Sequence, residues 1–364
     1  MNIHELETPA LLIDLDIMER NIRRVAEYAR SHNLRLRPHT KTHKTPALGR
    51  LQLDGGAAGL TVAKVGEAEV MAASGTPDLL VAYPVVGRSK LDRLMEVARK
   101  TQITVALDSI EAAQGLSDAA ARAGVEVGVL AEIDVGLDRV GVAPGPDVVR
   151  LVESLRRLPH LSFDGITFYP GHIRTVSAEG LEQLERLSTL LDRVIEDLGR
   201  AGISPRIVSG GSTPALFHSH HVRHLNEIRP GTYIFNDRNT VCAGACTLGD
   251  CAASILVTVV SAARPGRAMV DGGSKTFSSD ALSNQLDGGF GYIAEAPEVR
   301  FFRMQEEHGY LDTTRFERVL SVGDRLRIIP NHICAAVNLH ERIYGIRGER
   351  VEAVWRVEAR GKLQ

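Results

Sequence analysis

The chain alternates short apolar runs with longer amphipathic stretches over its first two thirds, and this alternation limits the folds open to it. The first amphipathic stretch runs from Asp14 to His32 and has helical spacing. The runs that predict strands are 34–39, 57–63, 79–83, 103–107, 125–133, 163–169, 206–209 and 226–228. The stretches that predict helices between them include 64–74, 90–100, 110–123, 148–157 and 178–199. Eight alternating units of this kind can close into a parallel barrel. We therefore predict an α/β fold, a (β/α)8 TIM-like barrel over residues 12–240.

The pattern changes after Cys251 to strand-like runs without clear helices between them. These runs are 255–260, 267–270, 325–329 and 351–357. The segment 343–355, with Gly345 and Gly348 between its two apolar parts, predicts a hairpin. We predict a second, mainly antiparallel β domain over residues 241–364, joined by the N-terminal residues 1–11.

Charge and composition give no sign of a nucleic-acid or membrane partner. The formal net charge is −2, and the longest largely apolar run, 252–263, is shorter than the roughly 20 residues that span a bilayer. The N-terminus lacks the pattern of a secretory signal. The four cysteines, Cys242, Cys246, Cys251 and Cys334, do not suggest a disulfide framework, and a reducing cytoplasm fits best. The first three lie close together and would permit a metal knuckle, but their spacing is not that of common zinc motifs, so we expect small buried thiols.

A basic run from Arg37 to Lys44 follows the first predicted strand. Barrel enzymes place their working residues at the carboxyl ends of the strands, so Lys41 is a candidate for covalent chemistry on a carbonyl group. The cations Arg37 and Lys44 would oppose the charged form of Lys41 and lower its pKa. Taken alone, the run also fits a solvated basic loop.

Other polar residues follow the later strands. Arg139 follows the fifth strand, and Tyr169 with His172 ends the sixth. The seventh is followed by Gly210, Gly211, Ser212 and Thr213, and the eighth by Gly231, Thr232 and Tyr233. The glycines and hydroxyls at 210–213, before a short helical stretch at 214–217, can bind a phosphate, although they also fit an ordinary turn. A reactive lysine and a phosphate site in one barrel mouth indicate pyridoxal 5′-phosphate (PLP).

A second candidate site lies in the predicted β domain. His332 and Cys334 are two residues apart, so on a strand both would face the same side and could bind one metal ion. Two protein ligands would leave positions open for water and substrate. The spacing also fits a packed histidine beside a buried cysteine. The histidines between the seventh and eighth strands are expected to lie in a solvated loop: His218, His220, His221 and His224.

In combination these motifs resemble the metal-activated PLP enzymes that contain D-threonine aldolase and eukaryotic-type D-serine dehydratase, with an alanine-racemase-like (fold type III) barrel and a β domain. The resemblance extends from the segment 7–11 to the segment 359–362. It implies that Lys41 binds the PLP aldehyde, that Arg139 and Tyr169 lie near the cofactor ring, and that 210–213 and 231–233 contact the phosphate. It also implies a homodimer, and a divalent metal at His332 and Cys334. The thiol ligand favours zinc, with manganese or magnesium as alternatives.

The resemblance leaves two lyase reactions open. The aldolases typically carry His-x-Asp where this chain has His332 and Cys334, and a histidine where it has Thr175; His172 looks more like its counterpart in the dehydratases. We therefore expect dehydration of a D-3-hydroxy amino acid to a 2-oxo acid and ammonia, with Lys41, Tyr169 and His172 as catalytic residues. The alternative is retro-aldol cleavage to glycine and an aldehyde. Racemisation would leave the metal pair without a role, and a non-catalytic PLP-binding protein would not need the β domain.

Overall fold

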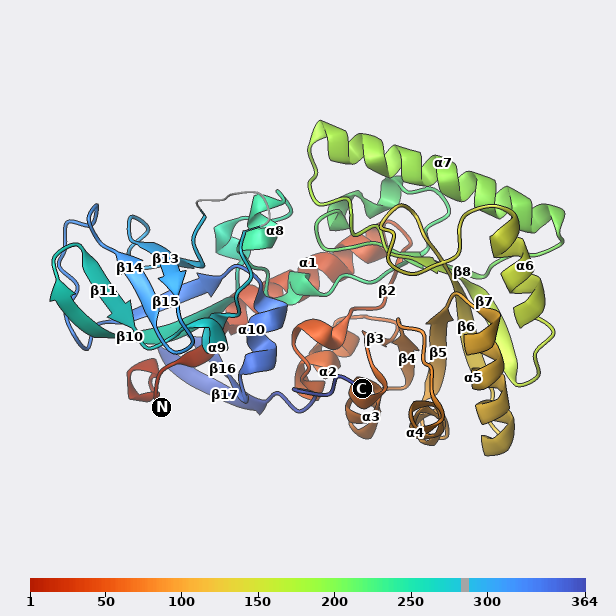
Figure 1. The fold of residues 1–364 in the computed structure, drawn as a ribbon, viewed down its shortest axis with the longest axis horizontal. Coiled ribbons are helices and arrows are strands. Elements are labelled where there is room, and N and C mark those ends of the chain that lie inside the picture. The colour runs from red at the N-terminus through yellow and green to blue at the C-terminus, as the bar shows by residue number, and fades with distance from the viewer. Residues whose placement is uncertain (283–287) are drawn as a thin grey trace. The chain divides into compact units, whose positions relative to one another are not determined.

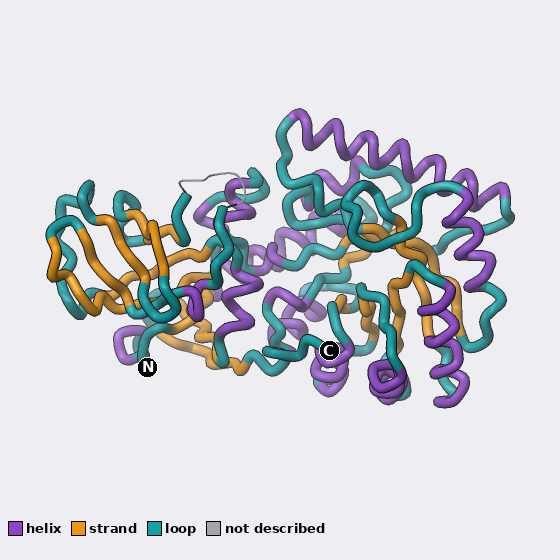
Figure 2. The backbone as a smooth tube through the Cα atoms, in the orientation of Figure 1, coloured by secondary structure: helices purple, strands orange, loops and turns teal. Residues whose placement is uncertain are grey.

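The computed structural model describes residues 1–282 and 288–364, which contacts within the chain divide into two compact units. The unit rich in parallel strands, called the barrel unit here, contains Arg24–Lys41, Pro46–Gly231 and Gly361–Gln364. The unit rich in antiparallel strands, called the β unit, contains Met1–Arg23, Thr42–Thr45 and Thr232–Arg360. Figure 2 distinguishes the helices and strands of each unit by colour. The domain bounds expected from the sequence, 12–240 and 241–364, stay a prediction.

Eight parallel strands, all within described residues, form the sheet of the barrel unit (Figure 1). Their order is β2-β9-β8-β7-β6-β5-β4-β3. A parallel bridge between His39 and Thr61 joins the two ends of this order, and the Thr61 amide donates to the Pro38 carbonyl at 2.7 Å. The α/β barrel predicted from the sequence is therefore confirmed. The strands are β2 (Arg35–Leu36), β3 (Leu60–Val62), β4 (Asp78–Val81), β5 (Gln102–Leu107), β6 (Val127–Ile133), β7 (Leu161–Phe168), β8 (Ile207–Gly210) and β9 (Glu227–Ile228).

The strands of the barrel unit are almost continuously apolar because helices and the barrel interior bury both of their faces. Leu80, Leu130 and Ile207 form one cluster of this core. Local signals also fix the helices. At α5 (Ile110–Ala123) the Ser109 hydroxyl accepts from the Ala112 amide at the start, and Gly124 ends the helix with φ +66°.

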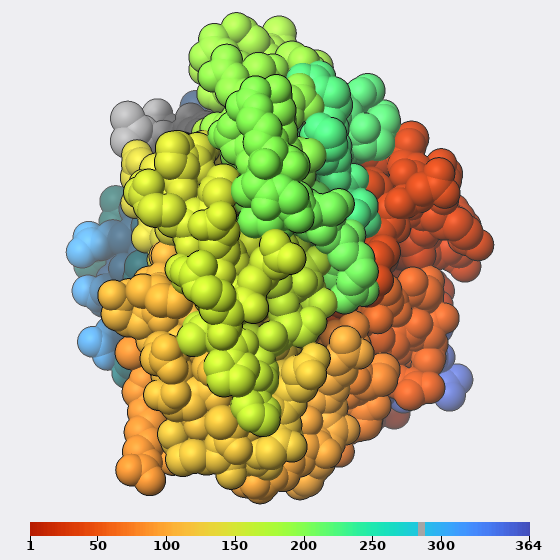
Figure 3. Space-filling model, turned by 90° about the vertical axis from the view of Figure 1, so that its right-hand side faces the viewer, coloured from red at the N-terminus to blue at the C-terminus, as the bar shows by residue number. Residues whose placement is uncertain are grey.

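Helices follow most strands of the barrel unit and cover its outer face. Figure 3 views the outer side of this unit, where the segments coloured yellow and green, including α6 and α7, lie at the surface. The structure adds one helix that was not predicted, α2, which follows the basic run. The helix α2 spans Pro46–Asp54. The bounds of the other helices differ from the predicted ones by a few residues: α1 (Leu15–Ser31), α3 (Val65–Ala73), α4 (Arg88–Ala98), α6 (Pro146–Leu155) and α7 (Ala178–Arg200).

Nine strands of the described residues form the sheet of the β unit. The main path is β13-β14-β11-β10-β1-β16-β17, and β15 pairs with β10 and β12. The pair β1–β16 is parallel and the other pairs are antiparallel. The mainly antiparallel β domain predicted from the sequence is confirmed. The strands are β1 (Ala10–Asp14), β10 (Ala253–Arg264), β11 (Arg267–Val270), β12 (Gly291–Ile293), β13 (Arg300–Met304), β14 (Gly309–Asp312), β15 (Arg325–Pro330), β16 (Arg342–Arg347) and β17 (Arg350–Arg356).

The predicted hairpin at 343–355 is confirmed as the antiparallel pair β16–β17. Three short helices of this unit were not predicted: α8 (Arg238–Cys242), α9 (Ser274–Phe277) and α10 (Ile333–Leu339). The described part of the chain contains no helix with the length and apolar character needed to cross a membrane.

Candidate active site

Three of the predicted site residues of the barrel unit gather around one aromatic ring. Lys41 lies in a 3-10 turn after β2, and its Nζ is 5.8 Å from the centroid of the Tyr169 ring. The guanidinium carbon of Arg139 is 4.8 Å from the same centroid. Cations favour the face of an aromatic ring at distances up to about 6 Å. The structure therefore brings Lys41, Arg139 and Tyr169 together.

The loop that carries Arg139 is held by two carboxylates. Asp108 Oδ2 accepts from the Gly141 amide at 2.9 Å. A side chain at Gly141 (φ +113°) would lie only 2.4 Å from the Asp134 nitrogen, so the loop requires glycine there. Burial opposes ionisation of Asp134, but the backbone hydrogen bonds lower its pKa below the ordinary value. Asp134 Oδ1 accepts at 3.0–3.2 Å from the amides of Gly136, Leu137 and Asp138.

His172 lies beside this loop. An added methyl group at Gly136 would be 3.7 Å from His172 Cε1, so the imidazole packs on this glycine. The His172 Nδ1 atom is buried and has no hydrogen-bond partner among the described residues. A buried nitrogen without a partner is costly, and it is available for a ligand.

The interior of the barrel contains a fully buried arginine that the sequence analysis did not assign a role. Arg229 donates to Thr167 Oγ1 and Ser209 Oγ, both at 2.6 Å, and to the Phe168 carbonyl at 3.0 Å. Burial lowers the pKa of Arg229, and the nearby carboxylate of Glu132 opposes this shift. Burial in turn raises the pKa of Glu132. The opposite charges of Arg229 and Glu132 stabilise each other in the protein interior, where either charge alone would be strongly destabilising.

Arg37, which is expected from the sequence to oppose the charged form of Lys41, forms ion pairs of its own. Arg37 binds both oxygens of Asp78 at 2.7 and 2.8 Å and Glu227 Oε2 at 3.0 Å. Although burial opposes its charge, these carboxylates raise the pKa of Arg37 above its ordinary value. Its positive charge is compensated, and its role is to tie β2 to β4 and β9.

The segment 210–213 has the features of an anion site. A side chain at Gly210 would lie 2.4 Å from the Phe168 ring, and Gly211 has φ +88°, so both positions require glycine. Ser212 and Thr213 are buried, and Ser212 Oγ has no partner among the described residues. An orphaned hydroxyl beside two glycines fits a bound phosphate. The site therefore fits the phosphate of PLP.

The predicted phosphate contacts at 231–233 are divided between the units. Gly231 ends the barrel unit, whereas Thr232 and Tyr233 belong to a 3-10 turn of the β unit. Tyr233 is buried. Thr232 Oγ1 lies 3.6 Å from the sulfur of Cys334, a proposed metal ligand. Their roles in phosphate binding stay a prediction.

The structure corrects the placement of His332 and Cys334. The two residues do not share the face of a strand, because His332 caps the amino end of α10 and Cys334 lies in its first turn. Their side chains still approach each other, since a hydrogen bond to Cys334 raises the pKa of His332 to about 9. Burial opposes ionisation of Cys334, but His332 brings its pKa below the ordinary value. A thiol that ionises readily beside an imidazole fits a divalent metal of intermediate softness.

The carboxylate of Asp237 fixes the start of α10, and this role was not predicted from the sequence. Asp237 Oδ2 accepts from the Ile333 amide at 3.0 Å, and Oδ1 accepts from the Thr240 amide at 2.9 Å. Asp237 is buried, and this burial raises its pKa. Its capping pattern with Thr240 at α8 was readable from the sequence, but its bond to Ile333 joins residues far apart in the chain.

The histidines at 218–224 form no larger metal cluster. In the described residues no group of three or more histidine, cysteine, aspartate and glutamate side chains is arranged to hold a metal ion. His220, His221 and His224 are exposed, and His220 Nδ1 lies 2.9 Å from Tyr28 Oη. His224 pairs with Asp192 at 2.9 Å.

All four cysteines are free thiols. Cys251 is buried as expected, and the other three are half-buried.

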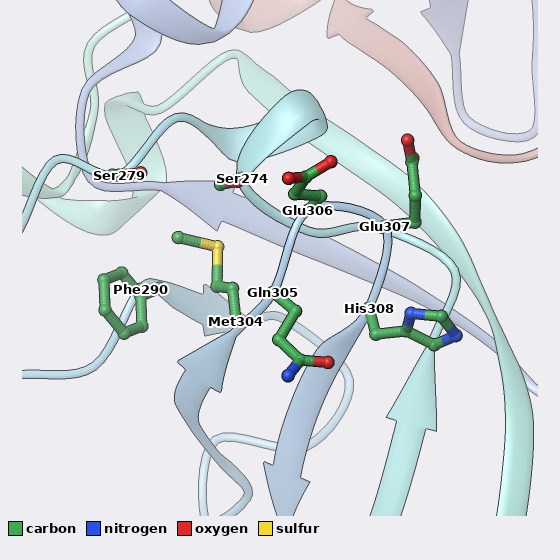
Figure 4. Close-up of a pocket in the computed structure, with 8 residues that line it drawn as sticks. All are labelled: Ser274, Ser279, Phe290, Met304, Gln305, Glu306, Glu307 and His308. Atoms are coloured by element: carbon green, nitrogen blue, oxygen red, sulfur yellow. The ribbon is translucent and has the colours of Figure 1, made fainter.

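Figure 4 shows an open pocket of about 620 Å³ in the β unit that contains none of the predicted site residues. Phe290 and Met304 supply its apolar side chains. Glu307, which precedes the metal pair in the chain, also lines it and binds Lys275 at 2.9 Å. The pocket is thus a feature separate from the residues assigned to the chemistry.

The barrel, the cation-flanked tyrosine, the orphaned serine and the imidazole–thiol pair define a class of protein, the PLP-dependent enzymes of the alanine-racemase-like fold. The chain matches the family described as "Alanine racemase, N-terminal domain" over residues 13–239, and "Putative serine dehydratase domain" over residues 252–346. The chain belongs to this alanine racemase family, and the resemblance expected from its motifs is confirmed.

Three relatives with known names are similar over nearly the whole chain. The 3-hydroxy-D-aspartate aldolase of Paracoccus denitrificans (strain Pd 1222) is 33% identical, over 100% of this chain and 94% of the relative. The D-threonine aldolase structure from Filomicrobium marinum has a TM-score of 0.93 at 33% identity, over 99% and 98% of the chains. The D-threo-3-hydroxyaspartate dehydratase of Delftia sp. HT23 has a TM-score of 0.87 at 31% identity, over 98% of each chain. These relatives are lyases, and the chain is accordingly a PLP-dependent lyase.

Two variants of a D-threo-3-hydroxyaspartate dehydratase have also been solved. In one a histidine is replaced by alanine, and in the other, which is in a metal-free form, a cysteine two positions further on is replaced by alanine.

Proposed function

We propose that this protein is a PLP- and metal-dependent lyase that dehydrates a D-3-hydroxy amino acid to a 2-oxo acid and ammonia. The observation that carries the proposal is the approach of the His332 imidazole to the Cys334 thiol, whose pKa values shift in opposite directions. The same residue types, at the same spacing, are altered in the two solved variants of a D-threo-3-hydroxyaspartate dehydratase.

The residues of the barrel unit would bind PLP and handle the proton at Cα. PLP supplies delocalisation of the electron pair left at Cα, and a divalent metal supplies polarisation of the 3-hydroxyl. Lys41 would hold the cofactor through its aldehyde in the resting enzyme and, as a free amine during the reaction, would remove the Cα proton. Ser212 and Thr213 would donate to the phosphate. Arg139 would hold the Tyr169 ring in place beside Lys41.

The residues of the β unit would control the leaving hydroxyl. His332 and Cys334 would hold the metal, which would supply polarisation of the 3-hydroxyl group. The 3-hydroxyl would then leave Cβ as hydroxide while the electron pair of the Cα–H bond forms the double bond. Zinc is the metal we propose first, because a thiolate ligand favours it over magnesium. The enamine product tautomerises to an imine. The imine takes up one water molecule, which replaces the water lost in the elimination, and gives the 2-oxo acid and ammonia.

A second candidate reaction is retro-aldol cleavage, and the names of two relatives favour it. Both the Paracoccus and the Filomicrobium proteins are aldolases and match almost the whole chain. In this reaction a base removes the hydroxyl proton and the Cα–Cβ bond breaks. At the position where we expect a histidine base in the aldolases, this chain has Thr175, whose hydroxyl lies 2.9 Å from Ser177 Oγ. A threonine hydroxyl is a poor base at neutral pH, and this favours dehydration.

Product analysis decides between the two reactions. The purified protein, loaded with PLP and zinc, is incubated with D-threonine, D-serine and D-threo-3-hydroxyaspartate. Dehydration gives 2-oxobutanoate, pyruvate and oxaloacetate respectively, each with ammonia. Glycine with acetaldehyde, formaldehyde or glyoxylate would establish the aldolase instead, and the Lys41→Ala protein provides the blank.

The proposal also includes a homodimer and a cytoplasmic location. The homodimer follows from the family resemblance, and size-exclusion chromatography with light scattering tests it. The cytoplasmic location is supported by the four free thiols, which suit a reducing compartment.

A further inference from the structure

We propose that Asp280 is a positioning residue for His332, which it orients as a metal ligand through the imidazole Nε2 atom. Asp280 Oδ2 lies 2.9 Å from His332 Nδ1. The inference rests on the proposed function, because it assigns a role in metal binding to a residue beside the proposed pair. The sequence alone gives no sign of it, since the two residues are 52 positions apart.

The contact between a carboxylate oxygen and a ring nitrogen determines which nitrogen of His332 carries the proton. An ionised carboxylate can only accept a hydrogen bond, so Nδ1 must carry the hydrogen that joins it to Asp280. When the imidazole is neutral, its lone pair then lies on Nε2. A carboxylate behind a ligating histidine fixes the tautomer and the ring orientation, and it makes the ligand nitrogen more basic.

Asp280 is itself held by neighbours. The Ser278 hydroxyl donates to Asp280 Oδ2 at 3.1 Å. The Asn331 side chain donates to the Asp280 carbonyl at 3.0 Å, and Asn331 is 2% exposed. Arg238 in turn donates to Asn331 Oδ1 at 2.8 Å. Because Asn331 directly precedes His332, one buried side chain sets the distance between the backbone of Asp280 and that of His332.

This contact contributes little to folding. The side chains of His332 and Asp280 are 43% and 46% exposed, and exposed ion pairs add little to stability. An effect of Asp280 should therefore be measurable in metal affinity while the unfolding temperature stays nearly constant. The two readouts separate a positioning role from a structural one.

The test measures the binding of Zn²⁺ and Co²⁺ to the PLP-loaded protein in metal-buffered titrations. The variants are Asp280→Ala, Asp280→Asn and His332→Ala. The matched control is Asp312→Ala, which removes another aspartate of the β unit, one that accepts locally from Thr314. The visible Co²⁺ spectrum reports the bond to Cys334, and the unfolding temperature is followed for each protein.

We expect Asp280→Ala to lower the affinity for both metals by about 10- to 100-fold, as the loss of such a supporting group typically does. Asp280→Asn should lie between it and the wild type, because the amide oxygen can still accept from Nδ1. Asp312→Ala should bind as the wild type does. Wild-type affinity in Asp280→Ala, with His332→Ala weakened, would overturn this inference alone. Equal binding by the wild type and His332→Ala, or no binding by the wild type, would overturn the proposed metal pair and this inference with it.

Discussion

The hydroxyl of Thr42 lies 3.2 Å from the sulfur of Cys334. A hydroxyl that donates to a sulfur stabilises the thiolate, which is the form of cysteine that binds metals. Thr42 belongs to the β unit together with Cys334, and it directly follows Lys41 in the sequence. The basic run that follows the first barrel strand therefore contains the proposed catalytic lysine and also a residue that contacts the proposed metal ligand Cys334.

Metal removal should abolish most of the lyase activity. His332 and Cys334 provide only two protein ligands, so the metal should be accessible to a chelator. We expect dialysis against EDTA to lower kcat at least 10-fold, and Zn²⁺ or Mn²⁺ to restore it. Cys334→Ala should show the same loss without restoration. Unchanged turnover after verified removal of the metal would exclude the metal mechanism.

Replacement of Lys41 should remove the covalent attachment of PLP. The Lys41→Ala protein is expected to lose the visible absorbance of the bound cofactor, because the substitution removes the amine proposed to hold the aldehyde. Lys44→Ala is the matched control, since Lys44 Nζ donates to the Ala359 carbonyl at 3.4 Å in the β unit. The opposite pair of spectra would reassign the anchoring lysine.

The Ser212 hydroxyl should contribute to the affinity for PLP and not to the stability of the fold. Its oxygen has no partner among the described residues, so Ser212→Ala removes an unsatisfied group and should leave the unfolding temperature of the PLP-free protein unchanged or slightly higher. The affinity for PLP should fall about 10-fold, the effect of one hydrogen bond to a charged group. Ser219→Ala is the control, because Ser219 Oγ donates to the Ala215 carbonyl. A normal PLP dissociation constant in Ser212→Ala would contradict the phosphate site.

Truncation of Arg229 should be severely destabilising. Arg229→Met leaves Glu132 and the polar partners of the guanidinium buried without compensation, so we expect a loss of about 3–5 kcal/mol in the free energy of unfolding. Arg206→Met should cost less than about 1 kcal/mol, because Arg206 is largely exposed in its pair with Asp164. Denaturation by urea gives both values, and similar losses would contradict the buried network.

The Asp134 loop should lose its stabilisation in acid. The pKa of Asp134 is lower in the folded protein than the ordinary value of about 3.9, so its contribution is fully present above that value and is lost as the pH falls through the lowered pKa. Asp134→Asn should lower the unfolding temperature by a few degrees at pH 7, and the difference should shrink below about pH 4. Asp118→Asn, on the exposed face of α5, should show no such trend. A difference that is undiminished at pH 3 would show that the charge is not responsible.

The barrel was readable from the sequence because its strands are buried on both faces and its helices carry local caps. The helix Ile110–Ala123 agrees with the prediction at both ends, since Ser109 and Gly124 mark them. The helix α10 was missed because His332, Ile333 and Cys334 have the alternation of a strand, and the bond from Asp237 that starts this helix comes from a distant residue. The strands β12, β13 and β14 are short and depend on pairing with each other and with β11 and β15.

The candidate site was predicted in part for the same reason. Lys41, Tyr169 and Ser212 follow the carboxyl ends of strands, where barrel enzymes place their working residues. The ion pairs of Arg37 were not predicted, because its partners Asp78 and Glu227 lie 41 and 190 positions away. Partners at that distance are set by the sheet order and not by the local sequence.

The strand β1 has a consequence for how the protein is made. It lies inside the sheet of the β unit, between β10 and β16, so its partners begin about 240 and 330 residues later in the chain. On the ribosome the apolar segment Ala10–Ile13 therefore emerges long before β10 and β16 are available to pair with it. The β unit completes its sheet only after β17 has been synthesised, whereas the barrel unit has all its strands by residue 228. Chaperone dependence in the cell should accordingly arise from the long interval in which β1 has no partner strand.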